Sequence, residues 1–180
     1  MKFTAKPIVL LFIVALLSSC VENLDFDQVE LDIDPIFNSP LVSLELDQND
    51  FFDVDNGVEI SSVVDITDLT ILDSSIIQDN LTQVIFNFEV ENRFDRSFVI
   101  QVLFFDDDDN ITENIQPFFI NAGDLNYTAN RRIFISNPSS FLNSTKLSVT
   151  VTLTPSSNQL DPDIPKTLSF KSAGTYYLSF

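Results

Sequence analysis

The densest group of side chains that could perform chemistry is a run of four aspartates, Asp106 to Asp109, followed by Asn110. Clustered carboxylates are hard oxygen ligands of the kind that Ca²⁺ prefers. The run also separates two apolar segments, as the tip of a β-hairpin would, and its charges would then only be solvated. We favour the hairpin tip and retain Asp106, Asp107, Asp108 and Asp109 as candidate Ca²⁺ ligands.

A second acid-rich segment, DVDNGVE at 53–59, tests the same idea. An EF-hand loop needs Gly at its sixth position and Glu at its twelfth. Counted from Asp53, Gly57 is fifth and Val64 is twelfth, so the pattern fails. The segment instead predicts a tight turn with Gly57 at positive φ.

The amino-acid composition argues against most enzyme classes. The chain has no His, no Trp and one Cys, which removes the Ser–His and Cys–His nucleophile pairs and the usual zinc ligands. A glycosidase needs two carboxylates set across a sugar cleft, and no local motif selects such a pair from the 27 acidic residues. We therefore expect a protein that is not an enzyme and has no cofactor; a carboxylate-based hydrolase is a less favoured alternative.

Charge is distributed unevenly along the chain, whose net charge is −18. Residues 21–92 contain 18 Asp and Glu and no Lys or Arg, whereas residues 93–180 contain 9 acids and 7 bases. Nucleic-acid binding requires clustered Lys and Arg, so nucleic acid is excluded as a partner. The acidic half also opposes electrostatic docking onto anionic lipid.

The first nineteen residues are typical of an export signal. Lys2 and Lys6 precede an unbroken apolar run of ten residues, 8–17. That run is too short for a helix across a bilayer, which takes about 20 residues. Residues 1–19 are therefore predicted to be a signal peptide.

The last residue of this run and the three that follow it, Leu17-Ser18-Ser19-Cys20, resemble the bacterial lipobox. The resemblance implies cleavage before Cys20, attachment of diacylglycerol to its thiol and acylation of the new amino group, with palmitate as a typical acyl chain. Two or more acyl chains hold a protein firmly on a membrane. Position +2 is Val21 rather than the Asp that retains lipoproteins at the inner membrane, which indicates the outer membrane.

The next residues do not decide which face of the outer membrane the mature protein occupies. Glu22, Asp25 and Asp27 loosely resemble the acidic tract that directs some Bacteroidota lipoproteins to the cell surface. The acids are not contiguous, so both the periplasmic face and the cell surface are retained.

The pattern of strand-like segments in the rest of the sequence predicts one all-β domain. We divide the chain into the signal peptide 1–19, a lipidated Cys20 with an acidic spacer at 20–38, and a sandwich domain at 39–180. The spacer could also be a first strand, with Val29, Leu31 and Ile33 on one face. About eight or nine strands with turn signals between them predict an antiparallel β-sandwich, immunoglobulin- or fibronectin-like, or a small barrel.

Particular segments support these strands. TQVIFNFEVEN alternates with Val84, Phe86, Phe88 and Val90 in phase. SFVIQVLFF at 97–105 is apolar on both faces except at Gln101, as expected for a central, covered strand. SSIIQDNLT could form a short helix capped by Ser74 or Ser75. The ending TYYLSF resembles the closing strand of an outer-membrane barrel, but we interpret it as the last strand of the sandwich.

Four arginines carry most of the positive charge after residue 92: Arg93, Arg96, Arg131 and Arg132. They could form a patch for an acidic partner or a lipid headgroup. We favour pairing with acids on neighbouring strands, and the candidate acids are Glu89, Glu91 and Asp95.

As a whole, the sequence resembles small, β-rich, Phe-rich lipoproteins of Bacteroidota. We expect a membrane-tethered module of the cell envelope that binds or supports another envelope protein without catalysing a reaction. A glycan- or lipid-binding lipoprotein with an apolar cavity is the alternative.

Overall fold

The computed structural model describes residues 34–136, 138–156 and 159–180. The predicted signal peptide, Cys20 and the possible strand positions Val29, Leu31 and Ile33 lie outside these residues. Within them, no helix has the length and apolar character needed to cross a bilayer.

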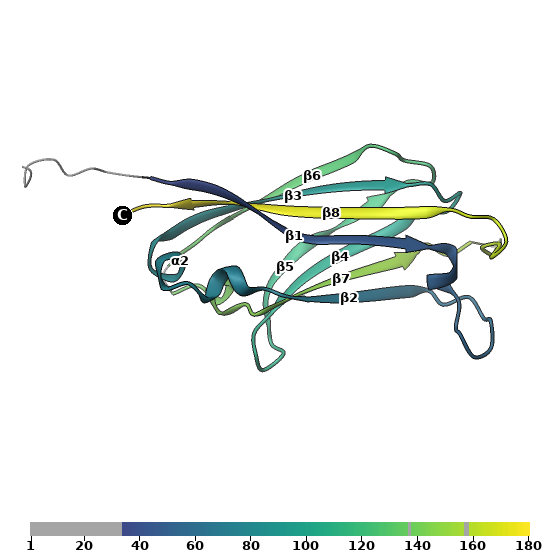
Figure 1. Ribbon diagram of the computed structural model, residues 1–180, viewed down its shortest axis with the longest axis horizontal. Helices are drawn as coiled ribbons and strands as arrows, with labels where there is room; N and C mark the ends of the chain where they lie inside the picture. Colours follow the sequence, from purple (N-terminus) through teal and green to yellow (C-terminus); the bar gives the residue numbers. More distant parts are fainter. Residues whose placement is uncertain (1–33, 137, 157–158) are drawn as a thin grey trace, which may run out of the picture. The chain divides into compact units, whose positions relative to one another are not determined.

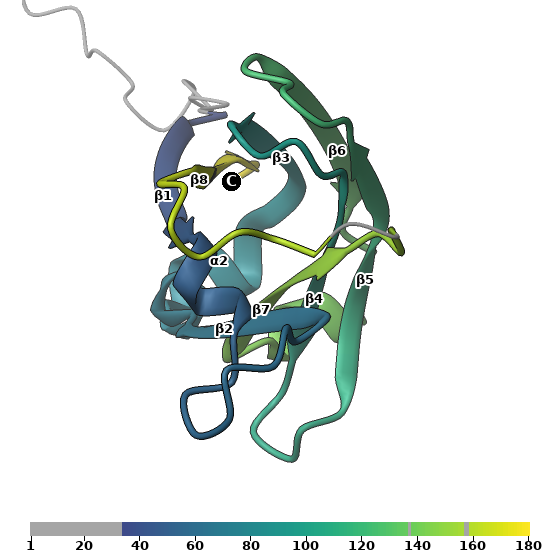
Figure 2. The same cartoon turned by 90° about the vertical axis from the view of Figure 1, so that its right-hand side faces the viewer.

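Eight strands form two four-stranded antiparallel sheets (Figures 1 and 2). The strands are β1 (Ile36–Asp47), β2 (Ser62–Asp68), β3 (Leu81–Asn92), β4 (Phe98–Phe105), β5 (Ile111–Ile120), β6 (Tyr127–Phe134), β7 (Lys146–Leu153) and β8 (Thr167–Leu178). One sheet has the order β1-β8-β3-β6 and the other has the order β2-β7-β4-β5. The antiparallel sandwich predicted from the sequence is therefore confirmed, and its first strand begins three residues before the expected boundary at 39.

The order of the strands is that of a jelly roll. Consecutive strands change sheet at every connection except the β4–β5 hairpin, so β1 and β2 lie in different sheets. In an immunoglobulin-like domain the first two strands pair with each other, so the immunoglobulin or fibronectin detail of the prediction does not hold. Alternation in a sequence fixes which face a side chain occupies, but it does not select the neighbouring strand.

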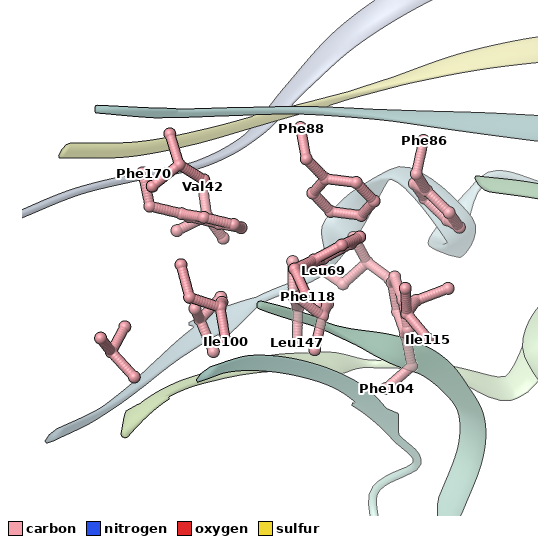
Figure 3. Packing of buried hydrophobic residues seen from close by; sticks show 14 of the residues in the cluster. Val42, Leu69, Phe86, Phe88, Ile100, Phe104, Ile115, Phe118, Leu147 and Phe170 are labelled. Atoms are coloured by element: carbon pink, nitrogen blue, oxygen red, sulfur yellow. The ribbon is translucent and has the colours of Figure 1, made fainter. Parts of the chain in front are cut away.

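Phenylalanines from both sheets fill the core (Figure 3). Val84, Phe86, Phe88 and Val90 of β3 are all at most 2% exposed, as their spacing predicted. The Phe88 ring lies 4.7 Å from that of Phe118 in the opposite sheet. Burial of each such ring contributes about 2–3 kcal/mol, so these contacts across the layers hold the sheets together.

β4 is a central strand, as predicted, but it is covered on one face only. Phe98, Ile100, Val102 and Phe104 are at most 1% exposed, whereas the alternate positions are half-buried. The outer face of its sheet consequently carries apolar side chains that nothing in the described domain covers.

The short predicted elements also form. Helix α2 (Ser75–Asn80) begins after the N-cap residue Ser74, whose side chain makes no capping hydrogen bond. Three 3-10 helices, η2 (Gln48–Phe51), η3 (Thr70–Asp73) and η4 (Ser140–Asn143), lie in the connections. In the predicted tight turn, Gly57 has φ +65° and the Asp53 carboxylate accepts hydrogen bonds from two backbone N–H groups, those of Asp55 and Asn56.

One aromatic residue of β8 is packed without a polar partner. The ring of Tyr176 stacks on Phe37 with centroids 5.0 Å apart and lies over Gly174, where a Cβ would come within 2.6 Å of the ring. The Tyr176 hydroxyl is buried and has no hydrogen-bond partner. Burial raises the pKa of this phenol above its usual value.

Candidate binding surface

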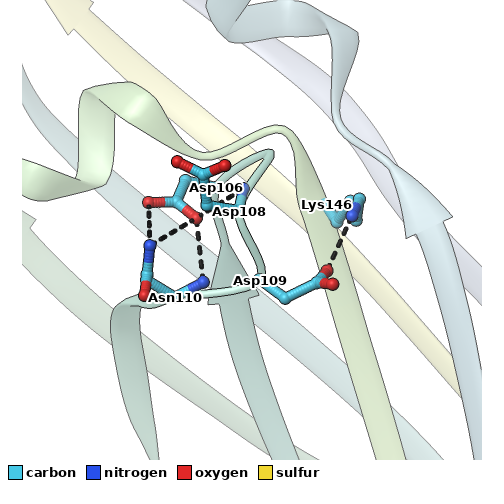
Figure 4. A network of polar contacts seen from close by, with 5 residues as sticks. All are labelled: Asp106, Asp108, Asp109, Asn110 and Lys146. Carbon is cyan, nitrogen blue, oxygen red and sulfur yellow. Dashed lines mark hydrogen bonds and ion pairs between the residues drawn. The ribbon is translucent and has the colours of Figure 1, made fainter.

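The four aspartates form the tip of the β4–β5 hairpin, as we favoured. Figure 4 shows three of them, Asp106, Asp108 and Asp109. Asp106 Oδ1 accepts hydrogen bonds from the backbone N–H groups of Asp108 at 3.0 Å and Asn110 at 2.8 Å. The side-chain amide of Asn110 also donates to Asp106 and, with the backbone bond from Asn110, holds the pKa of the Asp106 carboxyl below its usual value. Asp109 has φ 61° and its carboxylate lies 2.7 Å from Lys146 Nζ.

These contacts direct the carboxylates to different partners. Across residues 34–136, 138–156 and 159–180, no group of three or more Asp, Glu, Cys or His side chains is placed to hold a metal ion. The Ca²⁺ hypothesis for Asp106, Asp107, Asp108 and Asp109 therefore finds no support in the geometry. Hydrogen bonds within the turn account for the acid at its first position, Asp106.

Two of the four arginines pair with acids. Arg93 contacts Glu91 at 3.2 Å, one of the expected partners. Arg96 contacts Glu59 at 3.5 Å, and both side chains are at most 17% exposed. Glu59 also accepts a 2.6 Å hydrogen bond from the backbone N–H of Leu160, so this pair ties three loops together at one end of the sandwich.

The other two arginines lie over aromatic rings. The guanidinium of Arg131 lies 5.0 Å from the centroid of Phe118, and that of Arg132 lies 5.8 Å from the centroid of Phe134. Arg131 occupies an inward position on the edge strand β6, in register with Phe86 of β3. The expected acid Asp95 pairs instead with Lys166. The arginines therefore do not gather into one patch.

The outer face of the sheet β2-β7-β4-β5 carries few charged side chains, and we call it the neutral face. Register places the outward positions of β2, β7 and β4 in four rows of three. Of these twelve positions only Asp68 and Lys146, which lie in the same end row, are charged. The remaining rows carry aliphatic, hydroxyl or amide side chains.

Apolar side chains on the neutral face are exposed to solvent. Val64 is 56% exposed and Ile66 is 64% exposed on β2, and Phe119 is 55% exposed on β5. Small side chains separate them in the middle of the sheet, because Ser148 and Thr150 of β7 lie opposite Ile66 and Val64. The result is an apolar surface with few long side chains, in a chain that is otherwise strongly acidic.

Sequence reasoning did not identify this face. The apolar run of β4 predicts a strand that is covered on both sides, and it therefore does not reveal Val99, Leu103 and Phe105 as outward, uncovered positions. A signal was available in β7, where Ser148, Thr150 and Thr152 alternate with buried Leu147, Val149 and Val151. A central strand with a hydroxyl face indicates that its outer side is not covered by another layer.

The outer face of the other sheet differs in charge and shape. It carries Glu45, Glu89, Glu91 and Lys171. A hollow of about 510 Å³ lies at the β1 bulge between Pro40 and Val42, and Leu41 and Ala173 form part of its lining.

Comparison with protein-family models found no match to the sequence, and comparison with curated proteins found none either. Among solved structures, the chain is similar to a protein from Parabacteroides distasonis described as secreted, at 10% identity and a TM-score of 0.44, over 64% of this chain and 38% of that one. It is similar to infectious bursal disease virus, Gt strain, at 8% identity and a TM-score of 0.47, over 82% of this chain and 34% of that one. Similarity to Bacillus endospore appendages has 9% identity and a TM-score of 0.37, over 82% of this chain and 92% of that one.

The chain thus spans about a third of the length of the first two of these structures. The likeness concerns the arrangement of strands alone.

Proposed function

We propose that this protein is an outer-membrane lipoprotein, anchored through lipid on Cys20, that binds or supports another envelope protein without catalysing a reaction. The resemblance of residues 17–20 to a lipobox supports the anchor. The single observation that carries the binding role is the neutral face. The outward positions of β2, β7 and β4 mix apolar and uncharged polar side chains and are charged in one row only, on a chain of net charge −18.

A protein is the partner that fits the neutral face best. When another surface covers the exposed side chains of Val64, Ile66 and Phe119, their apolar area is removed from contact with water. This removal is the main driving force of protein association. Uncharged side chains with hydroxyls between them match the core of a protein–protein interface, which is depleted in charge. With Lys146 as the one base on these rows, the face offers nothing for phosphate-rich partners.

A glycan or lipid ligand is the second candidate, and the hollow at the β1 bulge favours it. Its volume of about 510 Å³ is within the range of small-molecule sites. Substituting Ala173 with Phe would place a ring in part of this hollow, so binding of a candidate glycan or fatty acid, measured by calorimetry, should be weakened in that variant. Unchanged binding would place the ligand elsewhere.

The anchor is tested in growing cells of a bacterium that lipidates proteins. We expect incorporation of labelled palmitate into the wild-type chain and none into Cys20→Ala. Globomycin, which blocks cleavage of lipoprotein signals, should cause the uncleaved precursor to accumulate. Fully processed, unlabelled wild-type protein would refute the lipid anchor.

The docking face is tested by a photo-crosslinking amino acid placed at Ile66, on the neutral face, in the same cells. The matched control carries it at Asn130, which is exposed on the outer face of the other sheet. We expect a discrete adduct with one envelope protein from position 66 only. Equal adducts from both positions, or no adduct from position 66, would refute docking through the neutral face.

A further inference from the structure

Apolar side chains cross the outer face of the sheet β1-β8-β3-β6 at one end. Strand register places Ile36, Tyr177, Gln83 and Phe134 in a line across all four strands, which we call the end row. Ile36 is 58% exposed and Phe134 is 71% exposed. Arg132, one row further along, places its guanidinium 5.8 Å from the Phe134 ring centroid.

The end row lies beside the point where the chain enters the sandwich. β1 begins at Ile36, beside the end of β8 (Figure 1). There the backbone N–H of Leu178 donates to the carbonyl of Pro35 at 3.1 Å. Residues 21–35 separate Cys20 from Ile36. An extended chain of that length reaches at most about 50 Å, so lipid on Cys20 would keep the end row close to the bilayer.

Along the strands, this face changes from apolar to acidic. Two rows of mostly polar side chains follow the end row, and Glu89 and Glu91 lie beyond them. Glu89 is six residues from Gln83 on β3, which corresponds to about 20 Å at 3.3 Å per residue. This separation exceeds the Debye length of about 8 Å at physiological ionic strength, so these acids do not oppose contact of the end row with a membrane.

We propose that the end row contacts the lipid bilayer to which Cys20 tethers the chain, so that the sandwich rests on the membrane through this end. The inference depends on the proposed lipid anchor and adds an orientation to it. Tyr and other amphipathic side chains prefer the membrane interface, and the aliphatic part of an arginine such as Arg132 can lie along the apolar boundary while its charge stays in water. The tether supplies a high effective concentration, so a small patch is sufficient.

This orientation agrees with the position of the neutral face. The end row lies on the outer face of one sheet and the neutral face on the outer face of the other, so lipid contact leaves the neutral face available to a partner. Asp34 lies two residues before the end row, which favours a lipid of zwitterionic headgroup over an anionic one.

The absence of Trp from the whole chain allows a clean optical test. The mature lipoprotein, processed in cells and not truncated further, is reconstituted into phosphatidylcholine vesicles that contain a nitroxide quencher at shallow depth. Phe134→Trp places the reporter in the end row, and Tyr177→Trp repeats the measurement on β8. Phe119→Trp is the matched control, because Phe119 is also exposed, at 55%, but lies on the neutral face.

We expect both end-row reporters to be quenched at least about two-fold more than the reporter at position 119, with emission shifted to the blue. Equal quenching of all three reporters in vesicles that carry the protein would overturn membrane contact by the end row and leave the anchor intact. Flotation of the vesicles tests the anchor separately: protein that fails to float with them refutes the lipid anchor, and the orientation that depends on it fails as well.

Discussion

Replacing Tyr176 with Phe should stabilise the protein. The hydroxyl is buried without a hydrogen-bond partner, and such a group costs about 1–3 kcal/mol. Its removal leaves the ring, which stacks on Phe37, and opens a space the size of one oxygen atom, on the order of 10–15 Å³. At about 24 cal/mol per Å³ of cavity that space costs roughly 0.3 kcal/mol. We therefore expect the free energy of unfolding to rise by about 1–2 kcal/mol.

The same ring disfavours a side chain at position 174 in the wild type. A Cβ at that position would lie 2.6 Å from Tyr176 Cε2 and 2.8 Å from the hydroxyl oxygen, both closer than side chains allow. Gly174→Ala should therefore lower the free energy of unfolding by about 1–3 kcal/mol. The cost should be smaller in the Tyr176→Phe background, because one of the close contacts is gone, which gives a measurable coupling between the two sites.

The stabilisation from Tyr176→Phe should increase at alkaline pH. Burial raises the pKa of Tyr176 in the folded state, so the unfolded chain releases this proton first, from about its ordinary pKa of 10.0. Rising pH then favours unfolding, by up to about 1.4 kcal/mol per pH unit above 10, in the wild type only. Below pH 10 the difference between the two proteins should be constant, because the phenol is protonated in both states.

Guanidinium unfolding followed by far-UV circular dichroism, at pH 7 and at steps from pH 9 to 11.5, measures all of these quantities. Tyr127 and Tyr177 are present in both proteins and serve as internal controls for general alkaline effects. A Phe variant that is less stable than the wild type, or a stability difference that stays flat above pH 10, would refute the account of a buried, unpartnered phenol.

Three further predictions concern the core and the loops. Phe88→Ala should lower the free energy of unfolding by about 3–5 kcal/mol, measured by guanidinium denaturation, because the ring joins the two sheets; a loss below 1 kcal/mol would contradict its role. Glu59→Gln should cost about 2–4 kcal/mol in the same assay by removing the carboxylate 3.5 Å from Arg96, and a neutral effect would count against that pair. As pH falls below the ordinary carboxyl pKa of 3.8 and then through the lower folded-state pKa of Asp106, the turn held by this carboxylate should open, because its contribution to stability is lost on protonation. The Asn110 amide reports this opening, and a protection factor there, corrected for the intrinsic exchange rate at each pH, that stays unchanged until the protein unfolds would contradict it.

The sequence was informative wherever a single segment decides the outcome. The alternation around Phe86, the short helix after Ser74 and the positive φ of Gly57 all depend on residues close together in the chain, and the structure contains each of them. The contact of Arg96 with Glu59 could not be predicted, because it joins loops 37 positions apart in the sequence that meet only when the sheets pack.

Arg131 shows an intermediate case. The sequence predicts that it pairs with an acid, but Tyr127, Ala129 and Ile133 alternate in phase with it, and the structure places all four on the inner face of β6. The ring of Phe118, in the other sheet, receives the guanidinium there. The alternation was a signal for this face that the sequence prediction did not use. The aromatic partner could not be predicted, because it comes from a strand whose placement depends on the jelly-roll connections.

The central claim is that the mature protein begins at an acylated Cys20 and acts from the membrane. Mass spectrometry of the intact protein, extracted from membranes of cells that process lipoproteins, tests it most directly. We predict a mass equal to residues 20–180 plus one diacylglyceryl group and one amide-linked acyl chain. A mature chain that starts at another residue, or that starts at Cys20 without lipid, would contradict the account.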